Sequence, residues 1–226
     1  MDALAARDQF ISVVSRELRN SVAPMVLLAD HFEQTTRGMA DSKLPSRVAT
    51  LRRQLHKFVA TIDQIAEVAK LRDGEIELDI AHVDMAAEVA DVAVRMREQA
   101  AAGGVDLVVE AGQPTHGWWD RARLRQIASH LVSNAIRYGG VGTVEVTVRH
   151  RGPDAELEVR DHGPGIGAAE LATLFDRLDH PSPRTSGGFG MGLFVVKAVA
   201  RAMGGGVSVD HAAGGGARFR VLLPRG

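Results

Sequence analysis

The chain has 226 residues, of which 45% are hydrophobic and 24% charged, a composition typical of globular domains. It has no cysteine, which excludes disulfides, zinc–thiolate sites and cysteine nucleophiles. The formal net charge of −1 argues against nucleic-acid binding through bulk charge. No apolar run reaches the ~18 residues of a membrane span, and the first ten residues lack the pattern of a signal peptide. We therefore expect no membrane contact and a cytoplasmic location.

Glycine is distributed very unevenly along the chain. Of the 24 glycines, only Gly38 and Gly74 precede residue 103. Glycine inside a helix costs ~1 kcal/mol relative to alanine, so the glycine-poor part suits long helices. We predict two domains, residues 1–73 and residues 74–226.

The first domain carries a long apolar stripe in two parts. Its apolar positions are three and four residues apart, the spacing of helices that pack lengthwise. Residues 38–45 contain Gly, Asp, Ser and Pro, which predicts a turn and hence a helical hairpin. A lone hairpin cannot bury the stripe on both helices, so we predict a homodimer through residues 10–72 that forms a four-helix bundle. The alternative is that the two helices pack on the rest of their own chain. The stripe comprises Val14, Leu18, Val22, Met25, Leu28 or Ala29, Phe32, Val48, Leu51, Leu55, Phe58, Ile62, Ile65 and Ala69.

The second domain alternates strand and helix patterns. Helices on one face of a mixed, mostly antiparallel sheet are expected, which is an α/β sandwich. The predicted helices cover residues 86–102, 121–138 and 193–203, and the predicted strands cover residues 105–110, 143–150, 155–161, 207–210 and 217–223.

Two glycine-rich loops lie in this domain, DHGPGIG at 161–167 and GGFGMGL at 187–193. Glycine lets the backbone approach a ligand, and the helix after the second loop offers free N–H groups to phosphate. The chain contains neither a GxxxxGK[ST] P-loop nor a G-x-G-x-x-G placed as in a dinucleotide-binding unit.

These loops are part of a larger set of motifs. HLVSNAIRY at 130–138, then DHGPGI, Leu174-Phe175 and GGFGMGL resemble the N, G1, F and G2 boxes of histidine-kinase ATPase domains, in that order. The hairpin is similar to the dimerisation and phosphotransfer domain that precedes such a domain. The resemblance implies a Bergerat-type ATP-binding fold behind the hairpin, with ATP and Mg²⁺ as cofactors.

The resemblance also implies site residues. Asn134 corresponds to the Mg²⁺ ligand, and an amide oxygen suits this hard ion. Asp161 corresponds to the carboxylate that accepts a hydrogen bond from the adenine amino group. Arg137 would reach phosphate and Tyr138 would lie beside the adenine. The implied nucleotide contacts further include Gly163, Gly165, Ile166, Arg184, Gly188, Phe189, Gly190, Met191, Gly192 and Leu193.

His130 departs from the family pattern, which usually has an asparagine one helical turn before Asn134. Residues four apart share a helix face, so His130 could contact Mg²⁺-bound water. It could equally weaken metal binding, or be a core histidine whose hydrogen bonds are satisfied. The residues leave all three readings open.

The expected phosphoacceptor is missing. The family motif is similar to S-H-E-L-R-N-P, whereas this chain reads SRELRNS at 15–21, with Arg16 at the acceptor position. A guanidinium stays protonated and has no lone pair to attack a γ-phosphate. Glu17 corresponds to the general base of that attack, and Asn20 to the residue that positions water for dephosphorylating a response regulator. The other hairpin histidines, His31 and His56, lack the surrounding motif.

We therefore predict a two-component transmitter protein that binds ATP and Mg²⁺ without phosphorylating itself. It would act on the receiver domain of a response regulator, with Asn20 as a phosphatase residue, or on another histidine kinase. One alternative is an active kinase that works in trans or on a non-standard acceptor. The other is a non-catalytic dimeric interaction module.

Overall fold

The computed structural model divides the chain into two compact units, Met1–Glu75 and Ile76–Gly226. The boundary lies two residues after the predicted one. In the part of the chain that the structure describes, no helix has the length and apolarity to cross a bilayer. The described residues are 22–23, 25–32, 34, 46–53, 55–56, 58–59, 62–63, 76–167, 171, 174–175, 191–212 and 215–226.

The described residues of the first unit are helical, including 25–32 and 46–53. An ion pair of 3.6 Å between Arg52 and Asp30 joins these two segments. The apolar stripe is buried at some positions, such as Ala29, but not at others. Side chains of the stripe that are 45–56% exposed are Met25, Leu28, Phe32, Leu51 and Phe58.

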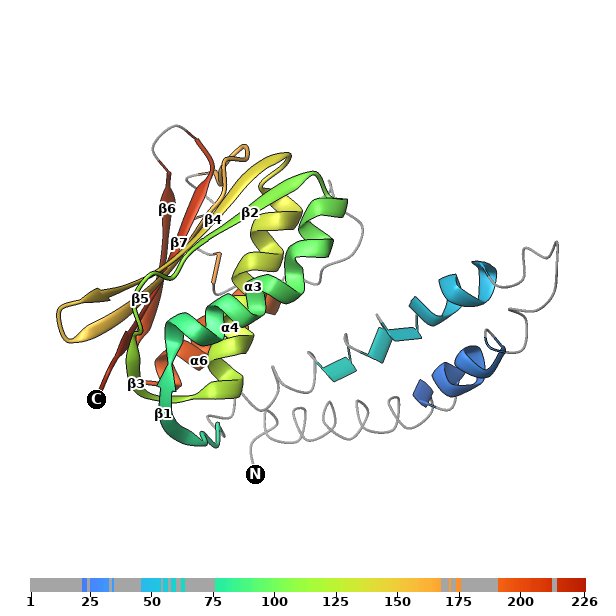
Figure 1. Ribbon diagram of the computed structural model, residues 1–226, viewed down its shortest axis with the longest axis horizontal. Helices are drawn as coiled ribbons and strands as arrows, with labels where there is room; N and C mark the ends of the chain where they lie inside the picture. Colours follow the sequence, from blue (N-terminus) through green and yellow to red (C-terminus); the bar gives the residue numbers. More distant parts are fainter. Residues whose placement is uncertain are drawn as a thin grey trace, which may run out of the picture. The chain divides into compact units, whose positions relative to one another are not determined.

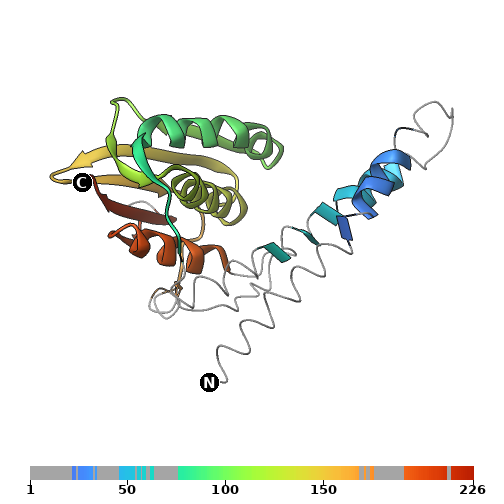
Figure 2. The same cartoon turned by 90° about the horizontal axis from the view of Figure 1, so that it is seen from below.

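The second unit is an α/β sandwich, which confirms the predicted fold class of this domain. A five-stranded sheet has the order β2-β4-β5-β7-β6, with β2 parallel to β4 and the other pairs antiparallel. Three helices, α3, α4 and α6, cover one face of it (Figures 1 and 2). The elements of the sandwich are α3 (Met85–Ala102), β2 (Val105–Glu110), α4 (Arg121–Tyr138), β4 (Gly142–Arg151), β5 (Asp154–Arg160), α6 (Met191–Ala202), β6 (Gly206–His211) and β7 (Ala217–Pro224).

The core lies between the helices and the inner face of the sheet. Alternate strand residues point inward, and Val146, Leu157 and Val221 are fully buried. On α4 the buried residues recur every three or four positions, from Leu124 to Ala135. This pattern places α4 between α3 and α6, its two helical neighbours.

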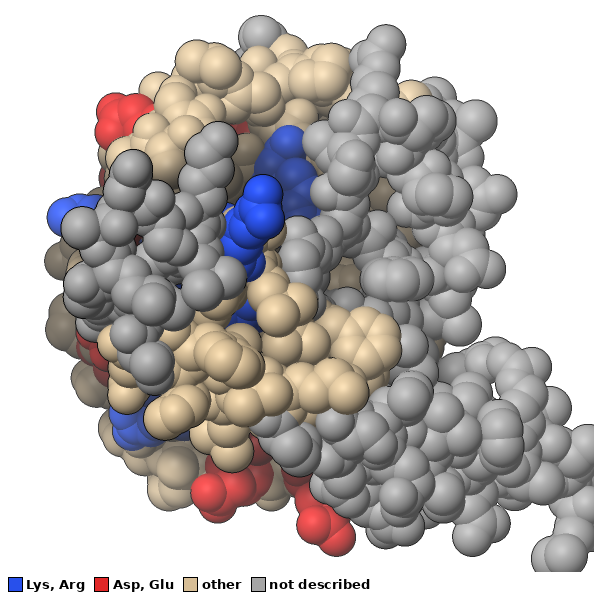
Figure 3. Space-filling model, turned by 90° about the vertical axis from the view of Figure 1, so that its right-hand side faces the viewer, with Lys and Arg blue, Asp and Glu red and all other residues tan. Residues whose placement is uncertain are grey.

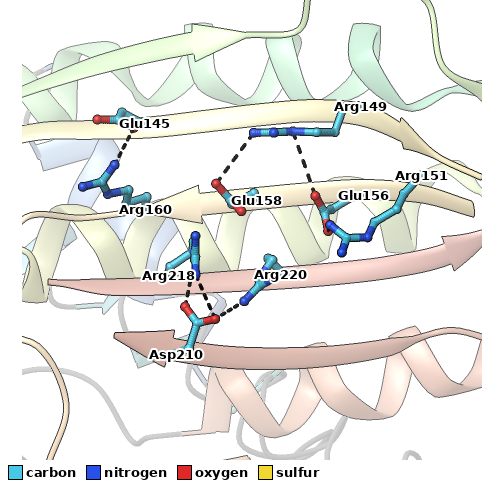
Figure 4. A network of polar contacts seen from close by, with 9 residues as sticks. All are labelled: Glu145, Arg149, Arg151, Glu156, Glu158, Arg160, Asp210, Arg218 and Arg220. Atoms are coloured by element: carbon cyan, nitrogen blue, oxygen red, sulfur yellow. Dashed lines mark hydrogen bonds and ion pairs between the residues drawn. The ribbon is translucent and has the colours of Figure 1, made fainter. Parts of the chain in front are cut away.

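The outer face of the sheet is charged rather than apolar (Figure 4). Glu156 is only 2% exposed, and its carboxylate lies 3.1 Å from Arg151 and 3.9 Å from Arg149. On the neighbouring strands, Asp210 pairs with both Arg218 and Arg220. Opposite charges on adjacent strands stabilise this face of the sheet, which lies opposite α3, α4 and α6.

A second, two-stranded sheet was not among the predicted elements. β1 (Ile80–Asp84) pairs antiparallel with β3 (His116–Asp120). Trp119 of β3 is fully buried and donates from its indole Nε1 to the carbonyl of Pro224 at 2.8 Å. Gly117 makes room for this ring, because a Cβ there would lie 2.3 Å from it. Both strands are short and β3 contains a glycine, so neither gives an alternating pattern that predicts a strand.

The ends of the predicted elements also need small corrections. The last helix is α6, Met191–Ala202, and begins two residues before the predicted start at 193. The predicted strand 155–161 is β5, which ends one residue earlier because Asp161 already belongs to the following loop. Shifts of one or two residues are usual where helices and strands fray.

Candidate nucleotide site

Asp161 is the most strongly fixed polar residue of the candidate site. It follows β5 directly, is 5% exposed, and its backbone N–H donates to the carbonyl of Ala217 at 2.9 Å. Its Oδ1 accepts hydrogen bonds from the backbone N–H groups of Gly163 at 3.0 Å and Ala217 at 3.1 Å. Among the described residues, no hydrogen bond reaches Oδ2. The carboxylate is therefore held rigidly through one oxygen, which leaves the other available to a ligand.

Three glycines surround Asp161 closely. A Cβ on Gly139, the residue after α4, would lie 2.6 Å from the Asp161 Cβ. A Cβ on Gly163 would lie 2.8 Å from the Gly139 backbone, and one on Gly216 would lie 2.0 Å from the Asp161 carbonyl oxygen. The end of α4, the loop after β5 and the turn before β7 thus meet at backbone distance around one carboxylate. Gly163 was among the predicted residues, whereas Gly139 and Gly216 were missed.

Replacing Gly216 with alanine should displace Asp161 and so weaken the candidate site. The residue has φ = +86°, and the new methyl would collide with the backbone of Asp161 and His162. We expect the free energy of unfolding to fall by about 2–3 kcal/mol, with weaker nucleotide binding because Asp161 is displaced. Thermal denaturation and nucleotide titration measure the two effects. Gly206→Ala is the matched control, since nothing lies within 4 Å of that position, and equal losses in the two variants would contradict the prediction.

The last turns of α4 carry three of the predicted residues. Asn134 is half-buried, while Arg137 and Tyr138 are exposed, Tyr138 by 40%. Gly139 then ends the helix, its N–H donating to the carbonyl of Ala135 at 2.8 Å. Since Gly139 touches Asp161, the structure places the end of α4 and the Asp161 carboxylate together.

His130 lies against the first turn of α6. A Cβ at Gly192 would sit 3.1 Å from the His130 Nδ1 and 3.6 Å from its Cγ. One edge of the imidazole therefore fills the space that a side chain at position 192 would need. Close packing against His130 thus favours glycine at position 192, in addition to the flexibility that the loop motif predicts.

The first glycine loop and the F motif are held against β7 and the turn before it. Gly165 has φ = +76°, and a Cβ there would lie 3.4 Å from the carbonyl oxygen of Gly216. Phe175 makes an edge-to-face contact with Phe219, with ring centroids 6.4 Å apart. Both contacts place the ends of the intervening segment beside β7.

The remaining predicted residues are only partly described. Ile166 and Leu193 are half-buried, and Met191 is described by its backbone at the start of α6. Residues that lie outside the described part of the chain are Arg16, Glu17, Asn20, Arg184, Gly188, Phe189 and Gly190.

One side of the molecule carries basic groups near its centre. In the space-filling view of Figure 3, Lys and Arg side chains lie near the centre of this face and also at its left margin, and the acidic side chains lie toward the margin. Within the described residues, no three His, Cys, Asp or Glu side chains gather closely enough to hold a metal ion. A metal at this site would therefore use other oxygen donors, such as an amide side chain, the ligand and water.

The sequence of this domain matches a known protein family. Residues 119–226 match the model described as "Histidine kinase-, DNA gyrase B-, and HSP90-like ATPase". Sequence similarity to histidine kinases extends over 97% of the chain. The chain corresponds to the transmitter region of sensor histidine kinases. Its resemblance to a transmitter region, first drawn from four motifs, is confirmed.

Among its relatives in this family is the sensor-like histidine kinase SenX3 of Mycobacterium tuberculosis, 31% identical over 97% of this chain and 54% of that protein. The sensor protein DivL of Caulobacter vibrioides is 30% identical over 99% of this chain and 29% of its own length. RstB of Escherichia coli is 29% identical over 98% of this chain and 49% of its own. The chain thus spans about half or less of the length of these curated relatives.

Two solved structures share the fold. Full-length ShkA, determined in complex with AMPPNP, superposes with a TM-score of 0.79 at 27% identity over 96% of this chain and 45% of that one. The mycobacterial sensor histidine kinase MprB gives a TM-score of 0.54 at 28% identity, covering 64% of this chain and 96% of that one.

Proposed function

We propose that this chain is a histidine-kinase transmitter that binds ATP with Mg²⁺, does not phosphorylate itself, and acts in the cytoplasm on a response regulator or a sister kinase. The observation that carries the proposal is the Asp161 carboxylate. Two backbone N–H groups fix its Oδ1, while Oδ2 accepts no hydrogen bond from the described residues. A buried acceptor of this kind suits the exocyclic amino group of adenine.

The neighbourhood of Asp161 supports a nucleotide rather than another ligand. Tyr138 is exposed beside the junction of Gly139 with Asp161, where its ring can cover a flat base. Arg137 is exposed in the same helical turn and can reach phosphate oxygens. ShkA was determined with AMPPNP, and the second unit of this chain shares its fold.

Mg²⁺ fits the donors that the chain offers. Asn134 provides an amide oxygen from the half-buried side of α4, and the described residues hold no set of three metal-ligating side chains nearby. Mg²⁺ commonly takes one or two protein oxygens and completes its shell with water and substrate phosphates. When bound, the ion would neutralise charge on the triphosphate. The chain's own part is to hold the base at Asp161 and the phosphates near α6.

The exposed apolar stripe supports a dimer. Within one chain, Met25 and Phe58 remain 56% and 45% exposed, although both belong to a stripe with the spacing of a packed helix pair. Burying such side chains against a second copy gains roughly 25 cal/mol per Å² of apolar surface. We propose a homodimer through residues 10–72, in which the two hairpins form a four-helix bundle.

Arg16 is the reason to propose that self-phosphorylation is lost. Transfer of a γ-phosphate needs a nucleophile with a free electron pair, and a guanidinium has none at any pH that a protein tolerates. Glu17, beside it, would then have no acceptor to deprotonate. The nucleotide half of the chain keeps its adenine acceptor, whereas the helical half lacks the group that would receive the phosphate.

Asn20 gives the proposal a testable enzymatic form. An amide one helical turn from Arg16 can orient water for attack on the aspartyl phosphate of a receiver domain, without any phosphohistidine. We expect the protein to speed the decay of a phosphorylated cognate receiver domain at least about tenfold, and Asn20→Ala to remove that acceleration.

Ser21→Ala, at the next position, is the matched control and should retain the acceleration. Decay is followed by the loss of labelled phosphate from the receiver domain. An unchanged decay rate with the wild-type protein, or equal rates for wild type and Asn20→Ala, would overturn the phosphatase form.

A second candidate function is phosphorylation of a histidine on another kinase. It is favoured by the same Asp161 geometry, since an ATP site of this kind can serve an acceptor in trans. Mixing the protein with a sister kinase whose own ATP site is inactivated distinguishes the two: label on the sister kinase supports this second function.

A further inference from the structure

The outer face of the two-stranded sheet carries a cluster of rings that the nucleotide site does not use. His82 of β1 and His116 of β3 are both exposed, and their imidazoles stack with centroids 5.1 Å apart and an interplanar angle of 7°. Trp118 of β3 lies opposite His82 in the register and meets its ring edge-on at 5.6 Å. Its side chain is 58% exposed.

We propose that His82 and His116 form a binding site for a divalent transition-metal ion, of which Cu²⁺ is bound most tightly. Neutral imidazole nitrogen is a good ligand for copper, nickel and zinc, and affinity for the first-row divalent ions peaks at copper. Two imidazoles on adjacent strands already lie face to face, so little chain entropy is lost when one ion joins them.

Both rings must turn out of the parallel stack to complete the site, because the lone pair of an imidazole nitrogen lies in the plane of its ring. The χ2 torsion of histidine has a broad energy minimum, so each ring can turn a nitrogen toward the gap between the strands. No third His, Cys, Asp or Glu completes a cluster here within the described residues. Water would therefore fill the remaining coordination positions, which makes this an open, solvent-accessible site.

The backbone around the two histidines is held firmly. The loop before β3 is fixed to the end of β1, because the Thr115 N–H donates to Asp84 Oδ1 at 2.8 Å. On the other side of β3, the Trp118 N–H donates to the Arg225 carbonyl at 3.1 Å, and Arg225 Nε donates to the His116 carbonyl at 2.8 Å. β3 is thus bonded on both edges, so the backbone keeps the two histidines close together.

Trp118 makes the site measurable. The chain has two tryptophans, and Trp119 is fully buried while Trp118 touches His82. Because a Cu²⁺ ion bound between the histidines would lie close to the Trp118 indole, titration with Cu²⁺ should quench its fluorescence in a saturable way. EDTA should reverse the quenching.

Variants separate this site from other histidines. We expect His82→Ala and His116→Ala each to weaken the quenching affinity at least about tenfold, whereas His56→Ala, an exposed histidine of the first unit, leaves it unchanged. Trp118→Phe should lose the fluorescence quenching. Its Cu²⁺ electron paramagnetic resonance spectrum should still show hyperfine splitting from two nitrogens. Thermal denaturation without metal checks that each variant folds.

Two results would overturn the proposal. One is quenching that rises linearly with Cu²⁺ and does not saturate in the wild-type protein. The other is saturable quenching that both histidine variants retain at full affinity. Neither result bears on ATP binding, because no residue of the cluster belongs to the nucleotide site.

Discussion

Asp161→Asn should reduce ATP affinity about 100-fold, or about 2.7 kcal/mol. The asparagine oxygen can still accept the N–H groups of Gly163 and Ala217, which bond to Oδ1 in the wild type. The amide NH2 then takes the place of Oδ2 and faces the amino group of adenine. Two donors would oppose each other in a buried site, so the loss exceeds that of one missing hydrogen bond. Isothermal titration with AMPPNP and Mg²⁺ measures it.

Two controls make this result specific. Because the two backbone hydrogen bonds persist, the melting temperature of Asp161→Asn should stay close to the wild-type value. Asp106→Asn changes an exposed carboxylate on β2 in the same chemical way and should bind nucleotide normally. Normal AMPPNP affinity in Asp161→Asn would mean that this carboxylate does not hold the base.

Arg16→His should convert the protein into one that phosphorylates itself. The substitution supplies a nitrogen with a lone pair at the position of the family acceptor, with Glu17 beside it as base. We expect acid-labile label from γ-labelled ATP to rise at least about 100-fold above background, the lower range for a positioned general base. Adding Glu17→Gln should remove most of this gain, since the base is lost while the histidine remains.

Arg16→Ala is the control, because it removes the guanidinium without supplying an acceptor. It should stay unlabelled. Combining Arg16→His with Asp161→Asn should also stay unlabelled, which would tie the new activity to the nucleotide site. Equal labelling of Arg16→Ala and Arg16→His would instead place the acceptor elsewhere in the chain.

The sandwich was largely predictable because its strands and helices have strong periods. β4 and β5 alternate apolar and polar residues around the turn at 151–154, and the predicted helix 121–138 has the observed bounds of α4. β1 and β3 were not predictable in this way. Their stability comes from Trp119, which is buried against Pro224 near the other end of the chain, and a local pattern carries no sign of that contact.

The candidate site was also predictable in part: residues within one motif were found, and residues brought together by folding were not. A motif pointed to Asp161 and Gly163, because both lie in one glycine loop. Gly139 and Gly216 lie 77 residues apart in sequence, and both lie against Asp161. Gly139 ends α4 directly after Tyr138, and its close approach to a distant carboxylate depends on the folded backbone.

The central claim is that ATP binds while no phosphate stays on the protein. Incubating the wild-type protein with γ-labelled ATP and Mg²⁺, and measuring bound nucleotide and acid-labile protein label in the same sample, tests it directly. We expect saturable nucleotide binding that Asp161→Asn weakens, with no label retained after denaturation. Acid-labile label on the wild-type protein, or no nucleotide binding at all, would contradict it.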